Sequence, residues 1–208
     1  LNGEFEMIVR TSLLMMFLVL GCLNPSEPND GDGNSSEAVP EDELTCHING
    51  ECIFSDHSAG LDWQGCPAGQ TGKNCDGTAE GKSHGEAMDY CENLSWGGFD
   101  HWHLPNIDEL RSLIRGCSTT EPGLSCPITH QCSHGIDNNC SASFCTGGCG
   151  LLSGPGAGGC FWPVDFPGEC NWLWASSLKS GISAFYVDFT YADVFSLNLQ
   201  HTGYDVRC

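Results

Sequence analysis

The chain has 208 residues, and its 27 acidic against 7 basic side chains give it a formal net charge of −20 at pH 7. A surface of this sign disfavours nucleic acids, anionic lipids and heparin-like polyanions as primary ligands. The 15 cysteines are more than a reducing cytosol usually accommodates, so we expect an exported protein with paired thiols.

The first 21 residues have the pattern of an export signal. Arg10 precedes an apolar run from Leu13 to Leu20, which is too short to span a bilayer in the mature protein. The V-L-G-C sequence at residues 19–22 is similar to a lipobox, where a bacterial signal peptidase cleaves and lipid is attached to the cysteine. We therefore expect a leader and signal peptide at residues 1–21 and a lipidated Cys22 that anchors the chain to a membrane. The alternative is an uncleaved anchor.

Residues 22–45 lack apolar periodicity and are rich in acids, proline and glycine, which predicts a flexible acidic tether. Oxygen-bearing residues there have the spacing of a calcium loop, namely Asp30, Asp32, Asn34 and Glu41. Ser35 stands where that loop requires glycine, so the tether is the preferred interpretation. Leu23 is not the Asp associated with inner-membrane retention. We therefore expect the outer membrane of a bacterial cell envelope, with the domain in the periplasm or outside the cell.

Two short helices are predicted between residues 83 and 116. Ser83 and Glu86 form a capping box ahead of the first helix, and a pair of glycines follows it. Asn106 and Glu109 form the same arrangement ahead of the second. Each helix has one apolar face, formed by Ala87, Tyr90, Cys91 and Leu94 in the first and by Ile107, Leu110, Leu113 and Ile114 in the second.

Apolar and polar side chains alternate over residues 185–189, over residues 195–199 and again over residues 204–208. This period of two predicts antiparallel strands that each bury one face. The inward positions are Phe185, Val187 and Phe189, then Phe195, Leu197 and Leu199, then Tyr204, Val206 and Cys208.

Residues 117–170 form a loop-rich insert with eight cysteines and many glycines. Because it has almost no apolar periodicity, we expect disulfides to hold it in place of a core. Without Cys22 the chain has six further cysteines outside the insert, so each set can pair within itself. Cys46 with Cys52 and Cys66 with Cys75 would close local loops, whereas the connectivity inside the insert is not predictable.

Four aromatic side chains in and after the insert are the candidate ligand-binding residues: Phe161, Trp162, Trp172 and Trp174. Rigid loops that expose these rings together would form a platform for the apolar faces of sugars or for the side chains of a protein. The alternative is that the rings cover the sheet. For Trp174 that alternative is favoured, because this residue begins a predicted strand.

A longer pattern extends over much of the chain. Its centre comprises Tyr90-Cys91, Gly97-Gly98-Phe99, Trp102, Leu104-Pro105 and Glu109-Leu110, with further matches at Trp63-Gln64, Cys66 to Cys75, Trp174 to Ser177 and Val206-Arg207-Cys208. Together these residues resemble the Lcl C-terminal domain family of bacterial surface proteins and lipoproteins, over residues 46–208. His103 stands where the family usually has Arg, and Asp62 where it usually has Met. An arginine-dependent interaction is therefore not carried over.

The resemblance implies a C-type-lectin-like fold of the α+β class, with two helices packed on a small antiparallel sheet and a long disulfide-rich loop insert. Such folds join the first helix to the last strand, which implies a Cys91–Cys208 disulfide. Their irregular middle binds the ligand, so the resemblance implies a surface-anchored lipoprotein whose loops 117–178 bind a glycan, an envelope polymer or a protein. We expect no cofactor, and the oligomeric state is not predicted.

Two other functions stay open. The first is a structural, disulfide-hardened envelope protein without a specific ligand. The second is an enzyme, because residues 104–110 also resemble a signature of formylglycine-generating oxidases. Those enzymes need a reactive cysteine pair near the C-terminus, where this chain has only Cys170 and Cys208. We therefore expect a binding module without catalytic residues.

Histidines also have zinc-ligand spacing in two places, at His101 with His103 and at His130 with Cys132 and His134. In an oxidising compartment Cys132 is better interpreted as a disulfide partner than as a thiolate ligand. We expect no metal site.

Overall fold

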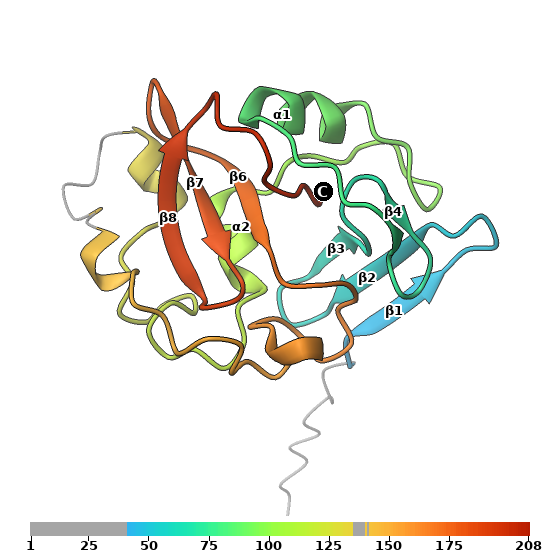
Figure 1. Ribbon diagram of the computed structural model, residues 1–208, viewed down its shortest axis with the longest axis horizontal. Coiled ribbons are helices and arrows are strands. Elements are labelled where there is room, and N and C mark those ends of the chain that lie inside the picture. The colour runs from blue at the N-terminus through green and yellow to red at the C-terminus, as the bar shows by residue number, and fades with distance from the viewer. Residues whose placement is uncertain (1–40, 135–139, 141) are drawn as a thin grey trace, which may run out of the picture. The chain divides into compact units, whose positions relative to one another are not determined.

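The computed structural model describes residues 41–134, 140 and 142–208. They form short antiparallel sheets and two α-helices (Figure 1). Seven disulfides join them. The export signal, Cys22, most of the predicted tether and most of its calcium-like spacing lie outside the described residues. Within the described ranges, no helix has the length and hydropathy of a membrane span.

The first sheet has the strand order β1 (Glu43–Cys46), β2 (Cys52–Asp56) and β3 (Leu61–Gln64), all antiparallel. β1 lies partly within the segment predicted to be tether, so the folded part begins by Glu43 and not at Cys46. The Cys46–Cys52 disulfide joins two residues that face each other where β1 turns into β2. A two-stranded ribbon follows, β4 (Gln70–Thr71) and β5 (Asp76–Gly77), spanned by Cys66–Cys75. Both local bridges are the ones expected from the sequence.

Both predicted helices are present. α1 (His84–Glu92) begins after Ser83 and α2 (Ile107–Ser112) begins after Asn106, each with a complete capping box. α1 ends at Glu92, before the glycine pair. The apolar face predicted for α2 is fully buried, and Ala87 and Cys91 are buried on α1.

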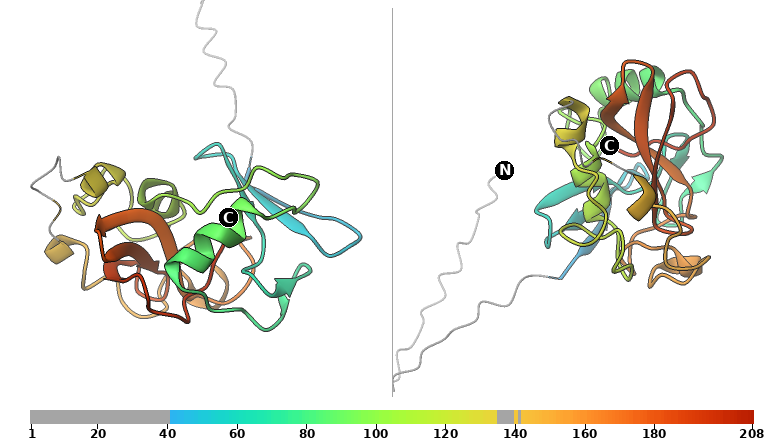
Figure 2. Two further views of the ribbon diagram at one scale, coloured as in Figure 1. Left: turned by 90° about the horizontal axis from the view of Figure 1, so that it is seen from above. Right: turned by 90° about the vertical axis from the view of Figure 1, so that its left-hand side faces the viewer.

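The C-terminal sheet is an antiparallel meander of β6 (Trp172–Ser180), β7 (Ser183–Asp188) and β8 (Asp193–Asn198). The inward positions predicted for β7 are buried. Those predicted for β8 are only half-buried: Phe195 stacks on Tyr186, and Leu197 packs on the core beside α1, while the fully buried Val194 lies on the other face. Alternation indicated only one covered face, whereas the sheet is covered on both. α2 packs on one face and α1 on the other (Figure 2).

Residues 204–208 do not form the predicted final strand. Two isolated bridges hold the segment, Lys82 to Tyr204 and Leu173 to Asp205, and all five of its residues are buried. Cys208 is joined to Cys91 of α1, the bridge that the family resemblance implied. The segment therefore runs through the interior and not along a sheet with one exposed face.

The insert has a core, contrary to the sequence-based expectation. Its buried side chains include Ile128, Phe161, Trp162 and Phe166, which pack with residues of α2 and the C-terminal sheet. Its cysteines pair within the insert, as Cys117–Cys149, Cys126–Cys145, Cys132–Cys140 and Cys160–Cys170. The disulfides add to this core and do not replace it.

Arg111 of α2 organises the first part of the insert. Its side chain is 2% exposed, and its guanidinium donates hydrogen bonds to the carbonyl oxygens of Thr120, Glu121, Cys126 and Ile128. Five donors in a planar fork suit such a convergent set of acceptors. A sequence pattern places an arginine on a helix, but it does not reveal that the helix end will be buried under a loop.

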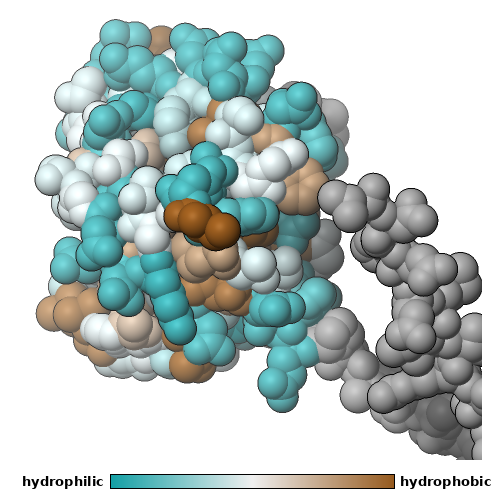
Figure 3. Space-filling model, turned by 90° about the vertical axis from the view of Figure 1, so that its right-hand side faces the viewer, coloured by the Kyte–Doolittle hydropathy of each residue, from teal (hydrophilic) through white to brown (hydrophobic). Residues whose placement is uncertain are grey.

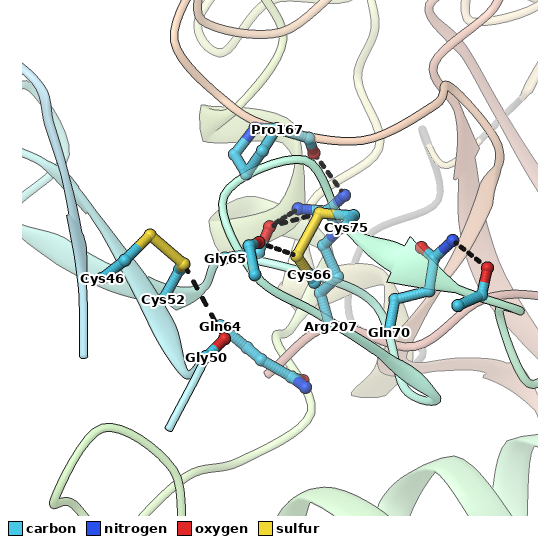
Figure 4. Close-up of a disulfide and its surroundings, with 12 residues drawn as sticks. Cys46, Gly50, Cys52, Gln64, Gly65, Cys66, Gln70, Cys75, Pro167 and Arg207 are labelled. Atoms are coloured by element: carbon cyan, nitrogen blue, oxygen red, sulfur yellow. Dashed lines mark hydrogen bonds between the residues drawn. A yellow bond between two sulfur atoms is a disulfide. The ribbon is translucent and has the colours of Figure 1, made fainter. Parts of the chain in front are cut away.

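Arg207 holds the second half of the insert in a similar way, by contacts with its side chains and backbone. Its guanidinium lies 5.2 Å from the ring centroid of Trp162 and 4.4 Å from that of Phe166. It donates to the carbonyl oxygens of Gly65 and Pro167 (Figure 4). Burial lowers the pKa of the Arg207 guanidinium, and the nearby Asp205 carboxylate opposes that shift.

We expect Arg207→Lys to lower the free energy of unfolding by about 3 kcal/mol, because an ammonium cannot stack between two rings and serve both carbonyls. Denaturant unfolding measures the loss. Arg115→Lys is the matched control, since Arg115 forms a partly exposed ion pair with Asp56. A loss no larger than that of the control would contradict the assigned role of Arg207.

Removing the Cys91–Cys208 bridge by double alanine substitution should cost about 5 kcal/mol, against about 3 kcal/mol for removing Cys66–Cys75. The first bridge joins residues 117 apart in the sequence and the second joins residues 9 apart, so the first restricts the unfolded chain more. Denaturant unfolding of the two double variants gives both values, and the reverse order would contradict the prediction.

Candidate functional site

A cavity of about 210 Å³ lies between the start of β3, the loop of residues 96–105 and the start of α2. We call it the aromatic pocket. The side chains around it that matter for recognition are Asp62, Phe99, His101, Trp102, His103 and Glu109. On the face that includes β1 and β4, the surface is mainly hydrophilic with small separate hydrophobic areas (Figure 3). On this face, a compact pocket is therefore a better candidate than a broad apolar surface.

The loop that supplies the rings is held at its start. Gly97 and Gly98 take positive φ values of 60° and 85°, which favour glycine and allow a tight turn bridged by Trp96 and Phe99. The buried Trp96 indole donates to the carbonyl oxygen of Cys52 at 2.7 Å. Trp102 in turn donates to the carbonyl oxygen of Trp96 at 3.2 Å. The loop is thus fixed to β2 before it reaches the pocket.

Two rings form walls at right angles. Phe99 and Trp102 meet edge to face, with centroids 6.2 Å apart and planes at 90°. Phe99 is 43% exposed, whereas Trp102 is half-buried. Such an angle offers two apolar surfaces to a ligand of ring size.

The acidic groups of the pocket are oriented by hydrogen bonds. Glu109 Oε2 accepts the backbone N–H of Asn106 at 2.7 Å and lies 3.2 Å from His103 Nε2. Asp62 Oδ1 accepts the hydroxyl of Ser55 at 2.6 Å. Both carboxylates are therefore held in place without a ligand, which lowers the entropy lost on binding.

Sequence reasoning missed this site. His101 was considered only for zinc-ligand spacing, His103 for that spacing and as a departure from the family pattern, and Phe99 and Trp102 only as family-pattern residues. The available signal was the density of rings, four within residues 99–103, in a loop with no helical or strand periodicity. Because no predicted helix or strand face would bury these side chains, the sequence favours their exposure to solvent.

The predicted aromatic platform is not formed. Phe161, Trp162 and Trp174 are each about 1% exposed, and only Trp172, at 43%, is exposed. Phe161 and Trp162 belong to the insert core, and Trp174 packs on Tyr204 while its indole donates to the carbonyl oxygen of Lys82. The alternative considered from the sequence, that these rings cover the sheet, describes three of the four.

The zinc-ligand spacings have other partners. Cys132 is bonded to Cys140. His101 lies 3.4 Å from Asp100, and His103 contacts Glu109. Across the described part of the chain, no three His, Cys, Asp or Glu side chains are placed to share a metal ion.

A serine and a histidine also meet, with Ser177 Oγ 2.8 Å from His130 Nδ1. Ser177 is fully buried and accepts the backbone N–H of Ile107 at 2.9 Å, so its hydroxyl holds the first residue of α2. All 14 cysteines in the described ranges are in disulfides, which leaves none of them as a free thiol there.

A family model described as the Lcl C-terminal domain matches residues 52–208 of the chain. This range contains α1, α2, the insert, the C-terminal sheet and all residues of the aromatic pocket. No curated protein and no solved structure matches the chain.

A second group of polar residues lies across the C-terminal sheet. Asp188 of β7 is paired with Asp193 of β8, so the two carboxyls are neighbours. On its other side Asp188 is paired with Trp172 of β6. Burial raises the pKa of the Asp193 carboxyl, and the nearby Asp188 acts in the same direction. The backbone N–H groups of Gly148 and Gly147 oppose the shift. Folding therefore disfavours the ionised form of Asp193.

We expect Asp193→Asn to stabilise the protein at neutral pH, because the amide avoids the cost of burying a charge and keeps an oxygen for the glycine N–H groups. Because the pKa of Asp193 is raised by folding, the cost of burying its charge in the wild type is present above the folded-state pKa. This cost disappears as pH falls below the pKa of Asp193 in the unfolded chain. The advantage of the variant should thus shrink on acidification. Denaturant unfolding across pH measures this, and a constant or growing advantage would contradict it.

Proposed function

Because the chain belongs to the Lcl C-terminal domain family, we propose that it is a binding module of the bacterial cell envelope. The protein is a lipoprotein anchored to a membrane, the outer one by preference, through Cys22. Its domain has a C-type-lectin-like fold and binds a glycan, an envelope polymer or a protein. The binding site is the aromatic pocket and not the 117–178 loops inferred from the sequence.

The observation that supports this proposal most is the combination of perpendicular rings and fixed carboxylates around one small cavity. At about 210 Å³ the cavity is smaller than the roughly 300–1,000 Å³ of pockets for drug-sized ligands. It suits a single sugar ring or one side chain of a partner. Aromatic walls bind the apolar face of a sugar, and Asp62 and Glu109 provide acceptors for its hydroxyl groups.

A structural envelope protein without a ligand is the second candidate. The observations that favour it are the burial of Phe161, Trp162 and Trp174 and the seven disulfides of the described residues. Binding is favoured over this candidate by the position of Phe99, whose 43% exposed ring lies on an anchored loop beside two carboxylates held by hydrogen bonds.

Phe99→Ala should weaken binding of any ligand found on a glycan array about tenfold, the equivalent of one lost ring contact of about 1.4 kcal/mol. Trp172→Ala is the matched variant, because Trp172 is exposed to the same fraction, 43%, outside the pocket. If only Trp172→Ala weakens ligand binding, the binding site lies at β6 and not at the aromatic pocket. A wild-type protein that binds nothing saturably, to glycans or to envelope proteins, would favour the structural candidate.

A further inference from the structure

The charges of the aromatic pocket have one sign at neutral pH. Two carboxylates line it, Asp62 from β3 and Glu109 from α2, and its lining contains no lysine or arginine. The ionisable bases there are His101 and His103, and each lies against a carboxylate, Asp100 and Glu109 respectively. The whole chain adds a net charge of −20. This field favours a cationic group over a neutral or anionic one.

The aromatic rings of the pocket also favour a cationic ligand. The faces of tryptophan and phenylalanine attract cations through their quadrupoles, most strongly where water is partly excluded. Trp102 and Trp63 both line the pocket together with Phe99. Aromatic walls next to carboxylates are the arrangement that recognises an ammonium group.

The two carboxylates come from separate elements, β3 and α2, and both line the pocket with the rings. A linear lysine side chain has an ammonium and an aliphatic stem but no hydroxyl group to donate to a second carboxylate. A pyranose ring with an amino group can place the ammonium at one carboxylate and hydroxyl groups at the other, with its apolar face on an aromatic wall.

We infer that the aromatic pocket binds a hexosamine residue with a free, protonated amino group. This inference rests on the proposed function and names the ligand class of the same site. The ammonium pairs with one of the two carboxylates, Asp62 or Glu109, hydroxyl groups meet the other, and the apolar face of the sugar lies on Phe99 or Trp102. N-acetylation removes both the charge and the compact shape of that group, so the acetylated sugar is discriminated against.

The test is an NMR titration of the full mature protein at pH 7 with four probes: glucosamine, glucose, N-acetylglucosamine and a lysine whose α-amino and α-carboxyl groups are blocked. Glucosamine should bind at least tenfold more tightly than the other three. Asp62→Asn should reduce glucosamine binding to the level of glucose, and so should Glu109→Gln, whose amide oxygen can still accept the Asn106 N–H. Asp89→Asn, on the exposed side of α1, is the matched control and should leave the affinity unchanged.

The outcomes separate the two proposals. Equal affinity for glucose and glucosamine, if sensitive to Phe99→Ala, would overturn the inference and leave the proposed function standing. Tighter binding of the blocked lysine would overturn the choice of a sugar. Glucosamine binding that persists in both carboxylate variants would overturn the assigned role of the pocket charges. If no probe binds, the inference is overturned; if neither glycans on the array nor envelope proteins bind saturably, the proposed function is overturned with it.

Discussion

The buried guanidinium of Arg207 is the interaction on which most of this domain depends. A charge without solvent needs partners that replace its water, and here they come from two parts of the chain that are distant in sequence. Gly65 directly follows β3, whereas Trp162, Phe166 and Pro167 lie in the insert. A shift of either segment alone would cost the buried charge part of its partners.

The same closing segment reaches the candidate site. Cys208 follows Arg207 directly, lines the aromatic pocket, and is bonded to Cys91 of α1. Its carbonyl oxygen also accepts the backbone N–H of Gln64 at 2.7 Å, next to the pocket residue Trp63. The wall of the pocket is therefore built from the most constrained part of the molecule, although its rings come from a loop. This places binding groups on a rigid support.

The parts predictable from sequence were those with local signals. Capping boxes at Ser83 and Asn106 define both helices, and short spacings indicate two of the disulfides. For β8 the periodicity indicated only one of two covered faces, and residues 204–208 were mispredicted as a strand because the segment is buried without a strand partner along its length. The aromatic pocket was missed because β3 and residues 99–109 meet only in the folded chain. Whether a tryptophan such as Trp162 is buried also depends on such long-range contacts.

The hairpin that begins the domain has a mechanical consequence. In β1, Glu43 pairs with Ser55 at the open end, and Cys46 pairs with Cys52 at the closed end. A pull on the chain ahead of Glu43 would unzip four residues of β1 and then meet the covalent link between the two cysteines. From there the load passes directly into the buried start of β2 and bypasses residues 47–51. The extension that such a pull can produce at this point is therefore limited to one short strand.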